Sequence, residues 1–360
     1  MLDPGEPLSG TLHVFVAFDW GDEILLEKVA QLVPTSVVAL PRRRRTPSSI
    51  SYHLPPLRMT LEPVALTLPH VGVVAAQAEL TLFDFGAVSL SFQIPFCLPS
   101  AGLRELAGAL ADPAPLLEKA RSVLLPLHTH LLPTIVDASW QADLSEEYFV
   151  FQFPCSRIDC AGDEDLLASL VHLENAALSA DEKREATRLR LSYAPQDLLV
   201  ADWTAAVLFD EDCDDTLQVI EFANLQLLEF RHIDNRLDDS LSVAGKTLQP
   251  LTRSYLPFWR GYSRPLRRLG ALKMEANDLF ERTGNALKLV GDPYLARVYR
   301  LLSARFHLET WEENIRRKLE VLEGVYQTVS DQASHFRTEF LEVIVVLLIV
   351  LEVILALRGH

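Results

Sequence analysis

The stretch LEVIVVLLIVLEVILAL, from Leu341 to Leu357, decides the fold class that the sequence predicts. Fifteen of its seventeen residues are apolar, and the two exceptions are Glu342 and Glu352. A helix of this length spans about 26 Å, a little less than the ~30 Å hydrocarbon core of a bilayer. The pattern predicts one C-terminal transmembrane helix at residues 341–357, followed by a short tail at residues 358–360. The carboxylate of Glu352 suggests a helix–helix contact inside the bilayer, because a lone charge there is costly.

The opposite end of the chain carries no targeting pattern. Residues 1–10, MLDPGEPLSG, contain two acidic residues and no basic residue. Signal peptides begin with a basic region, and transit peptides are rich in arginine. The sequence therefore predicts that the body stays in the cytoplasm and that the C-terminal anchor holds it at a lipid bilayer.

Residues 1–210 alternate between strand and helix patterns. Short apolar or alternating runs predict strands; they are Thr11–Phe18, Leu80–Phe83, Ala87–Phe96, Glu147–Phe153 and Leu198–Phe209. Helical spacing is found at Asp22–Leu32, Leu103–Leu132, Asp163–Ala177 and Asp181–Leu191. The turn Asp84-Phe85-Gly86 joins two of these strands into a hairpin. A mixed α/β domain over residues 1–210 is expected.

Residues 211–340 show helix patterns only. Asp214–Val243 is a long helical pattern without Gly or Pro, and Arg267–Val290 is a second one. Asp292 followed by Pro293 predicts a helix start, because Asp caps the first turn and Pro fits its first position. The predicted fold class is therefore α+β, with an N-terminal mixed α/β domain, an all-helical C-terminal region and one transmembrane helix.

The last part of this helical region carries a heptad pattern. Apolar residues at steps of four and three are Ile315, Leu319, Leu322, Tyr326, Val329, Ala333, Phe336 and Phe340. Such a seam needs a covering surface. It packs either on the earlier helices of the same chain or on a second copy in a coiled coil, and the second alternative predicts a homo-oligomer.

Charge is unevenly distributed along the chain. The formal net charge is −16, and residues 141–240 alone contain 23 acidic and 7 basic residues. Residues 251–305 are basic, and so is the run Arg42, Arg43, Arg44 and Arg45. The basic segments either pair with the acidic region or face anionic lipid or RNA. The four arginines form either a solvated loop or a phosphate-binding group.

Val219–Leu241 combines apolar and charged residues on one predicted helix. Glu229, Asp234 and Asp238 form a carboxylate ridge with Arg231 nearby. The ridge is either a salt-bridged interface between helices or a metal or acid–base site.

Motifs for catalysis and cofactor binding are absent from the sequence. No phosphate-binding glycine loop, nucleophile elbow or zinc-protease motif is present. His128 and His130 lack further ligands at metal spacing, and the four cysteines form no CxxC pair. We therefore predict no catalytic, cofactor-binding or metal-binding residues, and no DNA partner.

The chain resembles the YagE-like family, also called "required for meiotic nuclear division" and classified as domain of unknown function 155. The resemblance rests on the segments Arg44–Ile50, Phe83–Ala87 and Asn224–Glu229, and on Arg337, Leu341 and Glu342 leading into the apolar helix with Glu352. It implies a membrane-anchored protein without established enzymatic activity, whose mitochondrial members oligomerise and support translation. Because a transit peptide is missing, the bacterial inner membrane is the expected location.

Two hypotheses for function follow. The first is a non-enzymatic, membrane-anchored scaffold that self-associates and holds a cytoplasmic protein or ribosomal partner at the membrane. The alternative is a membrane-bound, metal-dependent enzyme acting on RNA or a nucleotide through Glu229, Asp234 and Asp238.

Overall fold

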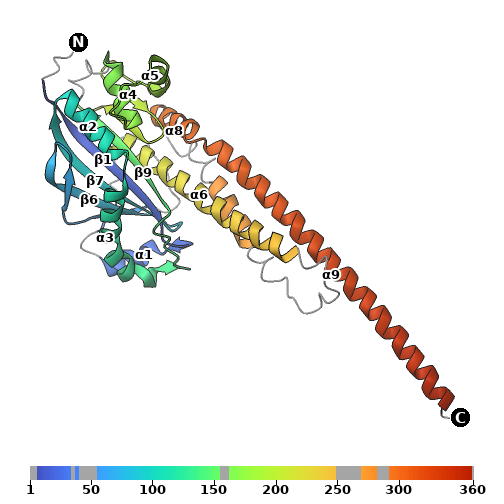
Figure 1. Ribbon diagram of the computed structural model, residues 1–360. Helices are drawn as coiled ribbons and strands as arrows, with labels where there is room; N and C mark the ends of the chain where they lie inside the picture. Colours follow the sequence, from blue (N-terminus) through green and yellow to red (C-terminus); the bar gives the residue numbers. More distant parts are fainter. Residues whose placement is uncertain are drawn as a thin grey trace. The chain divides into compact units, whose positions relative to one another are not determined.

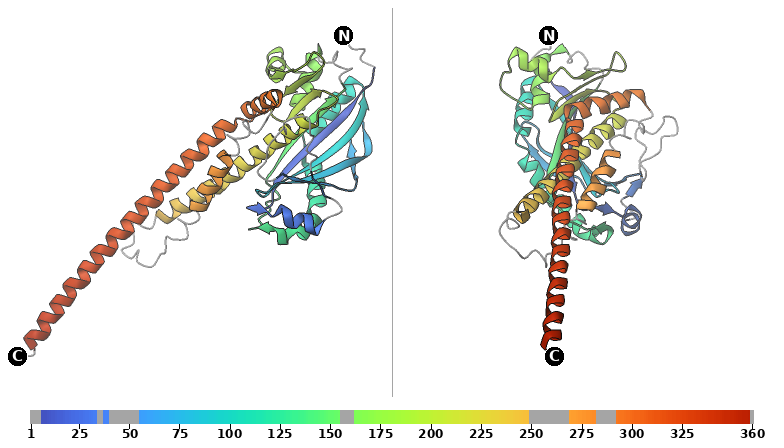
Figure 2. Two further views of the ribbon diagram at one scale, coloured as in Figure 1. Left: turned by 180° about the vertical axis from the view of Figure 1, so that it is seen from behind. Right: turned by 90° about the vertical axis from the view of Figure 1, so that its right-hand side faces the viewer.

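A computed structural model describes residues 6–33, 37–39, 55–154, 162–248, 269–281 and 292–358. The chain divides into two compact units. The first comprises Met1–His232 and Glu281–Glu309, and the second comprises Ile233–Phe280 and Thr310–His360. In the described residues, the first unit is a large sheet with helices on its faces, and the second unit is helical (Figures 1 and 2).

The strands belong to the first unit. They are β1 (Leu8–Asp19), β2 (Glu23–Ile24), β3 (Val37–Ala39), β4 (Leu57–Thr60), β5 (Val64–Leu68), β6 (Gly72–Leu82), β7 (Ala87–Leu98), β8 (Ile135–Val136), β9 (Ser145–Phe153), β10 (Arg190–Leu191), β11 (Leu198–Ala201) and β12 (Ala205–Phe209). Ten described strands form one sheet in the order β10-β11-β12-β9-β1-β7-β6-β4-β3, with β5 on β6, while β2 pairs with β8.

The first strand lies in the middle of the sheet. β1 pairs antiparallel with β7 and with β9. Because side chains alternate along a strand, Leu12, Val14 and Phe18 face the main hydrophobic core, while His13 and Ala17 face the other side. Both sides are covered, which explains why the predicted strand reads as an almost continuous apolar run.

The predicted hairpin at Asp84-Phe85-Gly86 is confirmed as the connection between β6 and β7. Phe83 N donates to Ala87 O at 3.0 Å and closes the turn. Gly86 has a φ of 92°, which favours glycine. Its carbonyl also accepts a hydrogen bond from Trp20 N at 3.0 Å, so the turn is tied to the chain that follows β1.

The predicted single strand Leu198–Phe209 is wrong, because the chain turns back within it. Asp202 N donates to Ala205 O at 2.9 Å, and the two halves form the antiparallel pair β11–β12. β12 then pairs with β9, and this pairing is parallel, whereas the other described pairings in the sheet are antiparallel. A parallel pair needs a crossover connection, and α4 and α5 lie within it.

The helices of the first unit cover the sheet. They are α1 (Leu26–Leu32), α2 (Ser100–Leu110), α3 (Ala114–Leu131), the short 3-10 helix η1 (Leu132–Thr134), α4 (Glu164–His172), α5 (Ala180–Ala186), the first part of α6 (Asp214–Leu248) and α8 (Pro293–Arg305). α2, α3 and α4 contribute leucines to the main core, whereas Leu225 and Leu228 of α6 pack on Ala17 at the opposite face (Figure 1).

Two predicted helix boundaries depend on proline. The pattern Leu103–Leu132 divides into α2 and α3 just before Pro113, while Pro126 remains inside α3. The predicted start at Asp292 is confirmed, because its carboxylate accepts a hydrogen bond from Tyr294 N at 2.6 Å. These boundaries follow from proline lacking an N–H group and from the capping carboxylate.

The second unit combines the end of α6, a helix at residues 269–281 and most of α9 (Leu308–Arg358). Its buried side chains come from all three; they are Ile233, Leu237, Leu269, Leu272, Ala276, Leu279, Phe280, Ile315, Leu319, Leu322 and Tyr326. Arg316 stacks over the Phe280 ring at 4.3 Å, and Lys273 pairs with Glu323 at 2.7 Å.

The predicted α+β class with a transmembrane helix is wrong. The structure has a mixed α/β arrangement with a large sheet, and in its described residues no helix is both long and apolar enough to cross a membrane. Residues 341–357 are instead the last turns of α9, a 51-residue helix whose earlier turns are densely charged. The apolar run is short and carries two glutamates. The predicted C-terminal anchor and single-pass inner-membrane location are therefore wrong as well.

Candidate functional site

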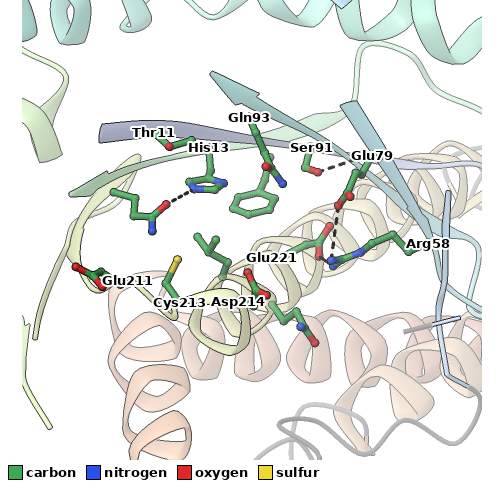
Figure 3. Close-up of a pocket in the computed structure, with 14 residues that line it drawn as sticks. Thr11, His13, Arg58, Glu79, Ser91, Gln93, Glu211, Cys213, Asp214 and Glu221 are labelled. Carbon is green, nitrogen blue, oxygen red and sulfur yellow. Dashed lines mark hydrogen bonds and ion pairs between the residues drawn. The ribbon is translucent and has the colours of Figure 1, made fainter. Parts of the chain in front are cut away.

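A pocket of about 200 Å³ lies in the first unit between the sheet and the first turns of α6. The sheet side of the pocket follows from the register of the strands. His13 of β1 lies opposite Gln93 of β7, and Ser91 of β7 lies opposite Glu79 of β6. Asp214 belongs to the helical wall. In Figure 3, His13 and Gln93 point from the sheet toward the side chains at the start of α6, whereas Glu211 lies at the margin of the pocket.

The side-chain amide of Gln152 holds His13, and a second hydrogen bond fixes the orientation of that amide. Gln152 Nε2 donates to Asp210 O at 3.0 Å, so its Oε1 faces His13 Nε2 at 2.8 Å. An amide oxygen only accepts, and therefore the proton of the neutral imidazole is on Nε2. Burial lowers the pKa of His13 below 6.5, while Gln152 and the charge of Asp214 act in the opposite direction. At neutral pH, Nδ1 of His13 is thus an acceptor.

A buried ion pair forms the other end of the pocket. Glu221 is 3% exposed, and its Oε2 lies 3.3 Å from Arg58 Nη2. Arg58 also lies 3.7 Å from Glu79. Burial raises the pKa of Glu221, and Arg58 with the hydroxyls of Ser89 and Thr81 offsets part of this effect. The Glu221 carboxylate is therefore costly to keep charged, and Arg58 is already engaged by two acids.

The thiol in the pocket is not a nucleophile at neutral pH. Burial raises the pKa of Cys213 to about 12, and the charges of Asp210 and Asp214 add to the effect. Because the thiolate is the reactive form, Cys213 acts here as a small buried side chain.

The lowered pKa of His13 predicts a pH dependence of stability. The unfolded chain takes up a proton near pH 6.5, whereas the folded chain does so only at lower pH, so stability should fall as the pH drops below 6.5. His13→Gln should flatten this dependence in urea denaturation between pH 8 and 5. His130→Gln, at an exposed histidine of α3, should keep the wild-type slope. Equal slopes for the two variants would contradict the assignment.

Three predicted interface residues lie on the part of α6 that packs on the sheet. Asn224 is 1% exposed and donates to Glu146 O at 3.2 Å. Arg231 forms an ion pair with the Glu146 carboxylate, and Glu229 is 6% exposed. Asn224 and Arg231 thus form a polar interface between α6 and β9.

The other two acids of the predicted ridge lie in the second unit. Lys318 bonds to Asp234 at 2.7 Å and to Asp238 at 2.6 Å. Burial acts to lower the pKa of Lys318, but the two carboxylates outweigh it and raise the pKa. Both acids thus neutralise one ammonium group. Within the described residues, no group of three His, Cys, Asp or Glu side chains could hold a metal ion.

The heptad seam is buried at its start. Ile315 and Leu322 are 0% exposed, and Leu319 and Tyr326 are under 10% exposed within the second unit. Further along α9, Glu342 is exposed. The side chains of Arg337 and Glu352 and the run Arg42–Arg45 lie outside what the structure describes, so their predicted roles stay predictions.

The pocket residues His13, Gln93 and Glu221 were missing from the predicted site. A signal for them is present in the sequence, because polar residues recur at every second position of strands that otherwise read as apolar: Thr11 and His13, then Ser89, Ser91 and Gln93. This alternation indicates a buried polar sheet face.

Comparison with known proteins identifies a family, and the descriptions of the matching proteins name no activity. Residues 9–216 match the family model described as "Uncharacterized protein MJ0711, N-terminal domain". The "Uncharacterized protein MJ0711" of Methanocaldococcus jannaschii is 26% identical over 197 residues, which cover 54% of this chain and 60% of the relative. No solved structure matches. These matches do not point to the YagE-like family, so the resemblance drawn from short segments is wrong.

Proposed function

The chain belongs to the family of the MJ0711 N-terminal domain, and on this premise we propose that it is a non-enzymatic scaffold that self-associates through the C-terminal part of α9. Self-association brings several copies of the first unit together, where they hold a partner protein.

The observation that carries the proposal is a run of exposed apolar side chains. Val345, Val346, Leu347, Leu348, Ile349 and Val350 are each 48% to 62% exposed. Successive residues of an α-helix are about 100° apart, so six in a row cover every side of it. A protein that leaves such a surface uncovered tends to associate, because exposed contiguous apolar patches mark interaction sites.

A second copy of the chain is the occupant that fits this surface. A helix that is apolar on all sides is normally enclosed by other helices. Identical helices supply the same apolar length and the same boundary, which the exposed Glu342 marks at the start of the run. The first part of the heptad seam, around Ile315 and Leu322, is already buried within its own unit and is not available for pairing.

Light scattering coupled to size exclusion tests the proposal on the full-length protein. Wild type should elute as an oligomer. The double variant Val346→Glu, Leu348→Glu should be a monomer, because residues two positions apart lie on nearly opposite sides of a helix, and charges on both sides of the run prevent close helix packing. Val321→Glu is the matched control, since Val321 is an exposed valine (52%) on the same helix but outside the run.

The outcomes separate clearly. An oligomeric wild type and control with a monomeric double variant support the scaffold proposal. A monomeric wild type at micromolar concentration, or an oligomer that the double variant retains, would overturn it.

A further inference from the structure

The exposed face of α8 carries two arginines. Arg297, Arg300 and Ala304 follow one another at steps of three and four, which places them on one face of the helix, and all three are exposed. Arg297 and Arg300 form no ion pair with any residue that the structure describes. By contrast, Arg305 at the end of the same helix is paired with Asp202. Two guanidinium groups of α8 are therefore available to an anionic partner.

An exposed tyrosine lies at the start of α8. Tyr193, in the loop between β10 and β11, is 73% exposed, and its ring lies 5.6 Å from the ring of Tyr294. The Cζ atom of Arg297 lies 5.8 Å from the centre of the Tyr294 ring. The Asp197 carboxylate accepts hydrogen bonds from Tyr193 N and Ala194 N, both at 2.8 Å. Tyr193 is thus exposed on a loop whose backbone is held in place, with an arginine close by.

An exposed tryptophan lies at the other end of α8. Trp203, in the turn between β11 and β12, is 43% exposed, and its ring lies 6.1 Å from Phe306 and 6.0 Å from His307. Because α8 has 13 residues, it is about 18 Å long. Two exposed aromatic residues therefore lie at opposite ends of this helix, with the two arginines on the exposed face between them. Tyr193, Arg297, Arg300 and Trp203 together form the α8 strip.

The acids next to the strip are already engaged. Asp197 accepts from backbone N–H groups, and Asp292 accepts from Tyr294 N at 2.6 Å. Asp202 is paired with Arg305. The net charge of the chain is −16, but charges at the surface are largely screened beyond about 8 Å at physiological salt. The two arginines of the strip are thus the local charges left to attract an anion.

This combination of side chains fits single-stranded RNA. Guanidinium groups bind phosphates, and exposed aromatic rings stack with unpaired bases, which a duplex keeps within its own stack. An acidic peptide would satisfy the arginines but offers no flat base to the two aromatic rings. We propose that the α8 strip binds single-stranded RNA, with Arg297 and Arg300 on phosphates and Tyr193 and Trp203 on bases. The strip lies within the first unit, so this binding is independent of self-association through α9.

Fluorescence anisotropy on the full-length protein tests the proposal with a labelled ten-nucleotide oligouridine. The RNA should bind at low salt, and its affinity should fall as salt is raised, because phosphate contacts release counterions. An RNA duplex of the same length should bind about tenfold more weakly or less, since its bases are not free to stack. An unlabelled polyglutamate peptide should not displace the oligouridine.

Variants locate the binding. Arg297→Gln combined with Arg300→Gln changes two exposed side chains, so folding should be kept. Affinity should fall about tenfold or more, and the salt slope should fall by about 1.4, since each phosphate contact on a single strand contributes about 0.7. Tyr193→Ala should weaken binding about fivefold or more at an unchanged salt slope, whereas Tyr193→Phe should bind like wild type. Arg184→Gln combined with Arg317→Gln is the control, because it makes the same change in net charge at exposed arginines outside the strip.

The outcomes are decisive in both directions. RNA binding that the strip variant loses and the control keeps supports the proposal. No binding of oligouridine by wild type at low salt, equal affinity for the duplex, displacement by polyglutamate, or equal loss in the strip variant and the control would overturn it.

Discussion

Replacing Gly86 with alanine should reduce the free energy of unfolding by about 3 kcal/mol, which is more than the same replacement at Gly72 should cost. An alanine at φ 92° is strained by about 1–3 kcal/mol. Its Cβ would also overlap the carbonyl oxygen of Gly21, and the carbonyl carbon lies only 2.8 Å away. The backbone would have to move, which weakens the hydrogen bonds of Trp20 N to Gly86 O and of Ile24 N to Asp84 O. Urea denaturation followed by circular dichroism measures the change.

Gly72 offers a matched control for this substitution. It has a similar φ of 79°, but an added Cβ would meet no atom within 4 Å. Gly72→Ala should therefore show only the backbone strain, about 1 kcal/mol. If both variants lost the same stability, the close approach of the turn to Gly21 would not matter.

Replacing Asp202 with alanine should destabilise the first unit by a comparable amount, about 3 kcal/mol, because it leaves buried charge without its partner. Asp202 is 2% exposed, and it pairs with Arg305 at the end of α8 and with His172 Nε2 at 3.2 Å. Its carboxylate also accepts from Trp203 N at 2.8 Å within the β11–β12 turn. One side chain thus connects the turn, α4 and α8.

Glu185 supplies the control, since it contacts the same guanidinium. Arg305 lies 3.3 Å from Glu185, whose side chain is 48% exposed. Glu185→Ala should cost less than about 1 kcal/mol, as surface ion pairs do. The denaturation midpoints of the two variants measure this difference. Similar losses of stability would show that Asp202 is no more important than Glu185 as a partner of Arg305.

Periodicity predicted the elements of this chain better than their arrangement. The strand at Thr11–Phe18, the hairpin at Asp84–Gly86 and the helix from Asp214 are all found, because each depends on local alternation or spacing. The order of the strands depends on contacts distant in sequence, such as β1 with β9, and no local pattern encodes it. The run at residues 341–357 was misassigned because its composition was considered without the charged helix that precedes it.

The pocket could be predicted only in part. Alternating polar residues in β1 and β7 indicate a polar sheet face, but they do not show which helix covers it. Glu221 reads as one acid among many in a strongly acidic segment, and only the fold places it beside Arg58, which is distant in sequence. The ridge of Glu229, Asp234 and Asp238 looked more significant in the sequence, because its members are close neighbours there.

The central position of β1 has a consequence for biosynthesis. This strand is synthesised before the other described strands of the sheet, yet one of its two neighbours, β9, ends only at Phe153. At about 5–20 residues per second, the 134 residues between Asp19 and Phe153 take roughly 7–27 s to translate. During that interval a nascent apolar strand has an unsatisfied edge. Chaperone capture or a slow translation rate should therefore affect the yield of this protein more than it would for a chain whose first strand ends up at a sheet margin.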